Sequence, residues 1–270
     1  MKTRIIAGLA LVVVLLLVLL VAPTYVATAM VGLMCGLASY EMLYRTGLVK
    51  NWRLNVYSAV MAFCVAVWSY FGASYAAALV GVLLYTMLLF VEMLTSSLKL
   101  PVQEPCMCLL SGIVVPFLLT ALVRILQMPG GRCLVFIPFL MAFLSDTGAY
   151  FVGVAFGKHK MAPLVSPKKS WEGFFGGIAT AVLGLMLYGL IIERFFLFEV
   201  NYLLVLVYGL LGAVAGVMGD LSMSVIKRQT GIKDYGNLIP GHGGILDRFD
   251  SVMITAPLCE ALILIIPFMV

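Results

Sequence analysis

Charge and glycine gather in one short stretch of an otherwise apolar chain. Eight charged residues fall between Asp220 and Asp250, although Lys and Arg total only 17 and Asp and Glu only 12 in all 270 residues. The same stretch contains the run Pro240-Gly241-His242-Gly243-Gly244. Glycines allow positive φ and close backbone approach, so N–H groups of this run could cradle a phosphate. The stretch is therefore predicted to carry chemistry on a phosphate.

Two carboxylates follow these glycines. If a helix begins near Leu246, Asp247 and Asp250 lie one turn apart at its N-terminus, where the helix dipole also favours anions. Carboxylates beside phosphate-binding groups are the usual setting for Mg²⁺, which takes one or two carboxylates together with substrate oxygens. Simple helix capping by Asp247 is the alternative, and it does not explain the whole string.

Two further carboxylates fall within apolar segments. Asp146 belongs to the run Ser145–Tyr150, and an ionised group there costs several kcal/mol unless it is paired, hydrated or metal-bound. Asp220, Ser224 and Lys227 are spaced i, i+4 and i+7, so they share one helix face. Both carboxylates are candidates for a functional site, with structural pairing to a neighbouring helix as the alternative for Asp146.

A lysine-rich loop is the remaining polar feature. Ser166-Pro167-Lys168-Lys169-Ser170-Trp171-Glu172-Gly173 follows Lys158-His159-Lys160. Four lysines in one short loop suit a polyphosphate or an anionic lipid headgroup. A plain topogenic loop would explain the lysines, but not the Ser-Pro turn, Trp171 or Glu172.

The elements that position these residues are predicted to be membrane helices. Hydrophobic residues make up 63% of the chain and charged residues 11%, against about 25% charged in soluble domains. In lipid a backbone must satisfy its own hydrogen bonds, so the apolar stretches should be helical. We predict an all-α, polytopic integral membrane protein with about nine transmembrane helices. The predicted spans are 5–22, 24–44, 55–72, 74–97, 107–127, 132–156, 173–193, 199–226 and 250–269.

The positive-inside rule predicts the orientation. With the N-terminus in the cytoplasm, only Arg124, Arg132 and Arg194 lie outside, and every other Lys and Arg lies inside. We interpret the apolar run from Ile5 to Val21 as a retained first span rather than a signal peptide. Both polar loops, 157–172 and 227–249, then fall on the cytoplasmic side, so one substrate could meet both.

The motifs resemble those of a known enzyme family. The run from Ser222 to Asp250 resembles the signature of the phosphatidate cytidylyltransferase (CDP-diacylglycerol synthase) family, and the segments 145–150 and 166–173 look like further family blocks. Ser170 stands where the family more often has threonine, which keeps the hydroxyl. The signature residues are Ser224, Lys227, Arg228, Lys233, Asp234, Pro240 to Gly244, Asp247, Arg248 and Asp250.

The resemblance implies a reaction and a division of the chain. The reaction is transfer of CMP from CTP to phosphatidate, giving CDP-diacylglycerol and pyrophosphate, in the cell inner (plasma) membrane with a cytoplasmic active site. A single transmembrane domain would span residues 1–270, with residues 1–130 as scaffold or dimer helices and 131–270 as the catalytic part. A homodimer is expected, and a nucleic acid polymer is not expected as a partner.

Roles for individual residues follow from the motifs and the resemblance together. We expect Asp220 and Asp247 to hold Mg²⁺, with a second metal ion as an option, and Asp146 to complete or orient that shell together with Asp250. His242 would position a phosphate or assist a proton. The expected substrate-binding residues are Ser166, Lys168, Lys169, Glu172, Ser224, Lys227, Arg228, Lys233, Asp234, Gly241, Gly243, Gly244, Arg248 and Asp250.

Two alternatives remain open at this point. A lipid kinase that uses CTP to phosphorylate a polyprenol or phytol would share the nucleotide region but release CDP. An ion-coupled transporter could use Asp146 and Asp220 as an ion path. Against the transporter stands the clustering of charge on one face and the lack of visible inverted repeats.

Overall fold

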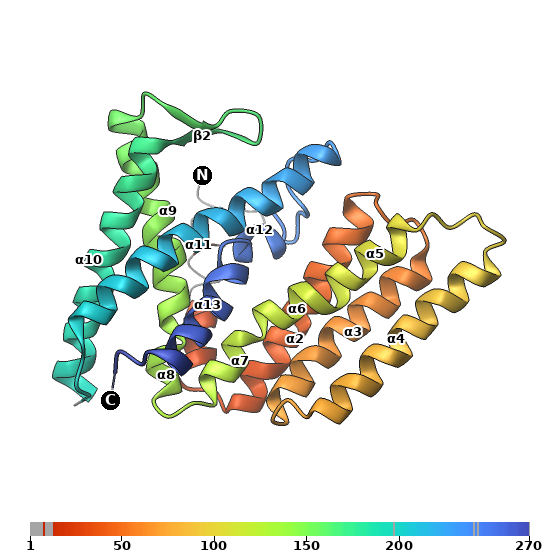
Figure 1. The fold of residues 1–270 in the computed structure, drawn as a ribbon, viewed down its shortest axis with the longest axis horizontal. Helices are drawn as coiled ribbons and strands as arrows, with labels where there is room; N and C mark the ends of the chain where they lie inside the picture. The colour runs from red at the N-terminus through yellow and green to blue at the C-terminus, as the bar shows by residue number, and fades with distance from the viewer. Residues whose placement is uncertain (1–7, 9–12, 197, 240, 242, 270) are drawn as a thin grey trace. The chain divides into compact units, whose positions relative to one another are not determined.

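The computed structural model describes residues 8, 13–196, 198–239, 241 and 243–269, and it is predominantly helical (Figure 1). The chain divides into two compact units. Unit 1 contains residues 1–128 and 229–249, and unit 2 contains residues 129–228 and 250–270. The segment that carries the predicted glycine run therefore packs with the N-terminal helices, in unit 1.

Unit 1 is a helical bundle. Its core contains Leu43, Leu54, Tyr85 and Cys108, and the Tyr85 hydroxyl bonds both the Ser58 hydroxyl (2.7 Å) and the Cys108 carbonyl (2.9 Å). Its elements are α2 (Thr24–Tyr40), the π-helical segment η1 (Glu41–Arg45), α3 (Trp52–Tyr70), α4 (Tyr75–Thr95), α5 (Gln103–Leu109), the π-helical segment η2 (Leu110–Val114), α6 (Val115–Leu119), α7 (Ala121–Leu126) and the short α12 (Leu246–Phe249).

Unit 2 is built on closely packed helices with small residues at their contacts. A Cβ atom on Gly177 would lie 2.7 Å from the Ser145 carbonyl oxygen, and one on Gly173 would lie 2.7 Å from that of Ala149. Small residues of this kind let membrane helices approach closely. The elements are α8 (Gly131–Leu134), α9 (Phe136–Phe156), the strands β1 (Lys160–Ala162) and β2 (Ser166–Ser170), α10 (Trp171–Phe196), α11 (Tyr202–Gln229, ending in unit 1) and α13 (Val252–Ile265).

The helices confirm the predicted class of fold. Six of them are long and apolar enough to cross a bilayer: 24–45, 75–95, 103–126, 131–156, 171–196 and 202–229. The helices α3 and α13 occupy two more predicted spans but are not among these six, and α13 has only 14 residues. The predicted first span, 5–22, lies partly outside the described residues. The chain is thus a membrane protein, while the count of nine spans remains a prediction.

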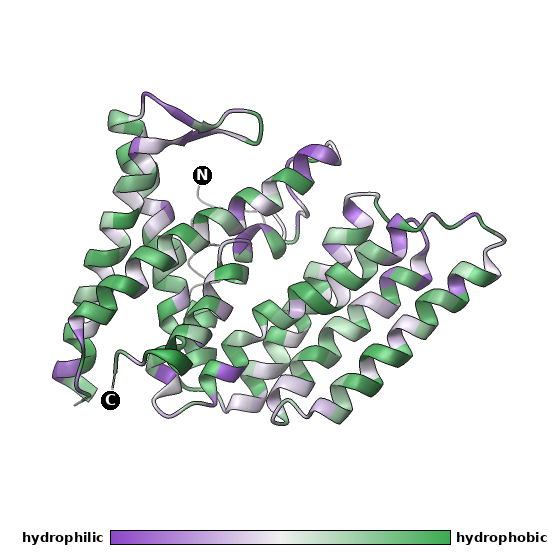
Figure 2. Ribbon diagram, in the orientation of Figure 1, coloured by the Kyte–Doolittle hydropathy of each residue, from purple (hydrophilic) through white to green (hydrophobic). Residues whose placement is uncertain are grey.

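Two local predictions were wrong. The lysine-rich loop is an antiparallel hairpin, in which β1 and β2 pair Lys160 with Ser170 and Ala162 with Ser166. The last predicted helix is broken, because α12 ends at Phe249 and α13 begins only at Val252. Hydropathy colouring shows hydrophilic residues gathered on the hairpin and at the C-terminal end of α11, while most helices are hydrophobic (Figure 2).

Candidate active site

A pocket in unit 2 brings together three of the sequence motifs. Its volume is about 270 Å³, and α9, the β1–β2 hairpin, α10 and α11 all contribute to it. Acidic and basic side chains share the pocket with apolar ones, which is an environment suited to an anionic headgroup attached to a lipid tail. The lining residues are Asp146, Ala149, Tyr150, Met161, Ser166, Lys168, Lys169, Ser170, Gly173, Phe174, Val217 and Asp220.

The carboxylates of this pocket are held by named partners. Lys169 Nζ lies 2.6 Å from Asp220 Oδ2, and the Ser224 hydroxyl donates to Asp220 Oδ1 at 3.2 Å. The Ser251 hydroxyl donates to Asp146 Oδ2 at 3.3 Å. Asp146 also experiences the charges of Lys169 and Asp220. The predicted functional carboxylates Asp146 and Asp220 therefore belong to one electrostatic cluster.

Asp250 belongs to the same cluster. It is buried, it lies 4.0 Å from Lys227 Nζ, and it experiences the charges of Asp220 and Asp146. Gly219 makes this approach possible, because a Cβ atom there would lie 2.5 Å from the Asp250 carbonyl oxygen. The break between α12 and α13 thus places Asp250 beside α11 rather than on a continuing helix. The predicted common face of Asp220, Ser224 and Lys227 is confirmed by these contacts.

Hydrogen bonds hold the hairpin at its base, just before β1, and at the turn between β1 and β2. Glu172, in the first turn of α10, accepts hydrogen bonds from the backbone N–H groups of Lys158 (3.1 Å) and His159 (3.2 Å), and lies 2.6 Å from His159 Nδ1. Arg228 Nε donates to the Val165 carbonyl at 3.2 Å. Glu172 and Arg228, both predicted to bind substrate, here hold the segment that carries the two pocket lysines.

The glycine loop lies in unit 1. Asp247 Oδ2 accepts hydrogen bonds from the N–H groups of Tyr235 (2.7 Å) and Gly244 (3.0 Å). Gly241 and Gly243 have positive φ (77° and 87°), and Ile239 donates to the Gly243 carbonyl at 3.0 Å. Glycine is the residue that adopts such backbone angles at low cost. The positive φ that the glycines were predicted to allow is therefore observed at Gly241 and Gly243, while the binding of a phosphate by this run remains a prediction.

The remaining predicted residues are exposed or lie outside the described part of the chain. Lys233, Asp234 and Arg248 are exposed in unit 1, and Lys168 is exposed on the hairpin. Pro240 and His242 lie outside the described residues. A common metal site for Asp220 and Asp247 remains a prediction, because the first belongs to unit 2 and the second to unit 1.

The unit 2 pocket has the donor chemistry that Mg²⁺ requires. Within the described part of the chain, no three His, Cys, Asp or Glu side chains form a group that could hold a metal ion. Mg²⁺ does not need such a group, since it commonly uses one or two protein carboxylates and completes its shell with water and substrate phosphate oxygens. Asp146 and Asp220 line one pocket and fit that requirement.

The profile described as "Cytidylyltransferase family" matches residues 2–266. The chain belongs to the cytidylyltransferase family. The resemblance noted from the motifs is thereby confirmed at the level of the family.

Similar proteins carry a more specific name. The chain is 45% identical over 126 residues to a phosphatidate cytidylyltransferase of Staphylococcus epidermidis, a match that covers 47% of each chain. It is 44% identical over 128 residues to one of Staphylococcus aureus, again 47% of each. It is 41% identical over 127 residues to one of Haemophilus influenzae, which is 47% of this chain and 44% of that one. The chain thus spans about half the length of the curated relatives it matches.

Two side chains of this family member were not singled out by sequence reasoning. Ser251 bonds Asp146, and Glu41 accepts hydrogen bonds from the N–H groups of Ile245 and Leu246 in the glycine segment. A carboxylate in an apolar helix was the available signal, but nothing in the sequence named its partners.

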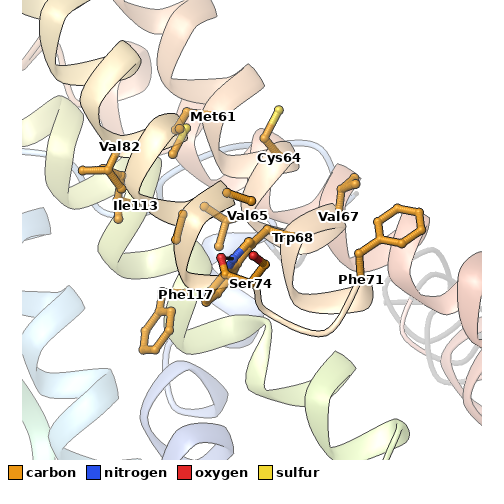
Figure 3. A pocket seen from close by; sticks show the side chains of 13 residues that line it. Met61, Cys64, Val65, Val67, Trp68, Phe71, Ser74, Val82, Ile113 and Phe117 are labelled. Carbon is orange, nitrogen blue, oxygen red and sulfur yellow. Dashed lines mark hydrogen bonds between the residues drawn. The ribbon is translucent and has the colours of Figure 1, made fainter.

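A second pocket is larger but lacks this chemistry. It lies in unit 1, has a volume of about 470 Å³, and is lined by residues such as Met61, Trp68, Phe71 and Phe117 (Figure 3). The Trp68 indole N–H donates to the Ser74 carbonyl at 2.8 Å. None of the described residues that line it carries a charge. The smaller, charged pocket of unit 2 is therefore the candidate active site.

Proposed function

We propose that this protein transfers CMP from CTP to phosphatidate, forming CDP-diacylglycerol and releasing pyrophosphate. The observation that carries the proposal is the unit 2 pocket, whose lining combines Asp146 and Asp220 with Lys168 and Lys169 among apolar side chains. Membership of the cytidylyltransferase family and the names of the similar proteins support the same reaction.

Transfer of CMP between two anionic substrates requires positively charged groups in the active site. A phosphatidate oxygen attacks the α-phosphorus of CTP, a new P–O bond forms, and the bond between the α-phosphorus and the bridging oxygen breaks as pyrophosphate leaves. Two anions must approach each other, and the attacking oxygen must lie in line with the bond that breaks. Positioning and charge neutralisation therefore supply most of the catalysis. Lys168 and Lys169 would screen the phosphates, with help from Lys227, Arg228, Lys233 and Arg248.

We further propose that Asp146, Asp220 and Asp247 hold Mg²⁺, and that Asp250 orients this shell. When bound, Mg²⁺ would supply Lewis-acid neutralisation of the phosphate oxygens. Lys169 pairs with Asp220 in the structure (2.6 Å) and would turn to a phosphate when the substrates bind. His242 would position a phosphate; a general base is not required, because phosphatidate is already ionised at neutral pH.

The setting of the reaction is also part of the proposal. The N-terminus and the hairpin would face the cytoplasm, where CTP is available, and the protein would lie in the cell inner membrane. The excess of Lys and Arg on the predicted cytoplasmic side supports this orientation. A homodimer is expected from the family resemblance.

The deciding experiment follows both products of CTP. Purified protein in detergent, given phosphatidate, Mg²⁺ and CTP, should release pyrophosphate and form CDP-diacylglycerol. Asp220→Asn and Asp247→Asn should abolish this transfer while each variant still elutes as a folded protein. Near-normal activity in either variant would remove that residue as a metal ligand. Release of CDP when a polyprenol or phytol replaces phosphatidate would indicate the lipid kinase, and turnover of neither kind would leave the transporter.

A further inference from the structure

Glu41 reaches the glycine segment from the other end of the sequence. It lies at the start of η1, is 4% exposed, and is separated from its partners by more than 200 residues. Its Oε1 accepts a hydrogen bond from Ile245 N (3.0 Å) and its Oε2 one from Leu246 N (2.9 Å). The first N–H groups of a helix have no partner within the helix. Glu41 therefore caps α12 with both of its oxygens.

Two glycines make room for this carboxylate. Gly236 and Gly244 are not among the glycines with positive φ, so their backbone does not itself demand glycine. A Cβ atom on Gly236 would lie 2.5 Å from Glu41 Oε1, and one on Gly244 would overlap both carboxylate oxygens. The space above these glycines is occupied by Glu41. Their small size is thus explained by a protein side chain.

The same loop is held from a second direction by Asp247. Asp247 Oδ2 accepts from Tyr235 N and Gly244 N, so the N–H groups of residues 244, 245 and 246 all donate to one of two buried carboxylates. Hydrogen bonds to a charged acceptor are stronger than neutral ones, and a buried donor that loses its acceptor is costly. The orientation of Asp247 is therefore coupled to the position of Glu41.

We propose that Glu41 is a positioning residue for cytidylyl transfer, which fixes the glycine loop and through it the Asp247 carboxylate. The inference rests on the proposed function, in which Asp247 belongs to the reacting centre. It assigns to the N-terminal region, expected to supply scaffold or dimer helices, a direct part in shaping the catalytic loop. The π-helical turn at Glu41 agrees with this role, because such turns often occur at functional sites.

Glu41→Gln is the sharpest test, because it keeps the size of the side chain and replaces one acceptor oxygen by an NH₂ group that faces a backbone donor. We expect kcat to fall about 10- to 100-fold, as for residues that orient a ligand, with little change in the KM for phosphatidate. Hydrogen exchange at residues 244–246 should accelerate. Glu92→Gln is the matched control, since Glu92 belongs to the same unit and bonds Asn51 and Tyr57 instead; it should leave both measurements unchanged.

A double substitution tests the steric half of the argument. Gly244→Ala should lower kcat in the wild-type background, but should add little to Glu41→Ala, where the new methyl group has room. Losses that multiply in the double variant would overturn the inference, as would Glu41→Gln with normal kcat. If the wild-type protein transfers no CMP while Glu41→Gln still accelerates exchange at residues 244–246, the loop contact stands and the catalytic role falls with the proposed function.

Discussion

Lys169 Nζ lies 2.6 Å from Asp220 Oδ2, which joins the β1–β2 hairpin to the α11 helix across the candidate active site. Both side chains are only partly exposed, 19% for Lys169 and 25% for Asp220. A lysine held in this way cancels the charge of the carboxylate in the absence of substrate. Under the proposed function, the same lysine would exchange that partner for a phosphate when the substrates bind.

Lys169→Gln should therefore impair the reaction far more than it impairs folding. We expect kcat to fall by about 10²- to 10³-fold, the usual cost of removing one group that stabilises transition-state charge. Steady-state transfer of labelled CMP measures this. Lys160→Gln makes the same change of charge in the same hairpin, but Lys160 is exposed and does not line the pocket. Equal losses in the two variants would argue that only the overall charge of the hairpin matters.

Ser251→Ala should produce a graded loss at Asp146. The Ser251 hydroxyl donates to Asp146 Oδ2 at 3.3 Å, and removing one such bond costs about 1 kcal/mol, or roughly fivefold in rate. Asp146→Asn removes the charge itself and should abolish transfer. Rates of the two variants, measured in parallel, test this order. A Ser251→Ala variant as inactive as Asp146→Asn would mean that Ser251 does more than orient the carboxylate.

Local periodicity accounts for what the sequence predicted about this site. The common face of Asp220, Ser224 and Lys227 depends only on helical spacing, and the contacts Ser224–Asp220 and Lys227–Asp250 agree with it. The positive φ of Gly241 and Gly243 likewise follows from local backbone chemistry. Predictions of this kind need no knowledge of the neighbouring helices.

Contacts between distant segments could not be predicted in the same way. The bonds of Glu41 to residues 245 and 246 and of Ser251 to Asp146 join segments more than 100 residues apart. Such pairs depend on which helices pack together, and apolar periodicity does not specify that. The hairpin was missed because its strands have only three and five residues, and alternation is barely visible over that length.

Labelling from one side of the membrane should test the proposed orientation. Asn237 is exposed in the glycine segment of unit 1, and Phe71 is exposed at the end of α3 that the positive-inside rule places outside. A membrane-impermeant maleimide added to intact cells should label Phe71→Cys and spare Asn237→Cys until the cells are opened. The unmodified protein gives the background from its own exposed cysteines, Cys64 and Cys106. The reverse pattern would invert the topology.

Gly219→Ala should be damaging where Gly216→Ala, one turn earlier on α11, is tolerated. A Cβ atom on Gly219 would lie 2.5 Å from the Asp250 carbonyl oxygen and 3.2 Å from Ser251 Cα, both on the backbone that joins α12 to α13. At Gly216 the nearest atom is Thr255 Cγ2 at 3.5 Å, an ordinary contact. Overpacking of this kind costs about 1–3 kcal/mol.

The added methyl group of Gly219→Ala would also push Asp250 and Ser251 away from Asp220 and Asp146, so activity should fall together with the thermal stability measured in detergent. Similar stability and activity in the two variants would mean that the approach of Asp250 to α11 does not shape the site.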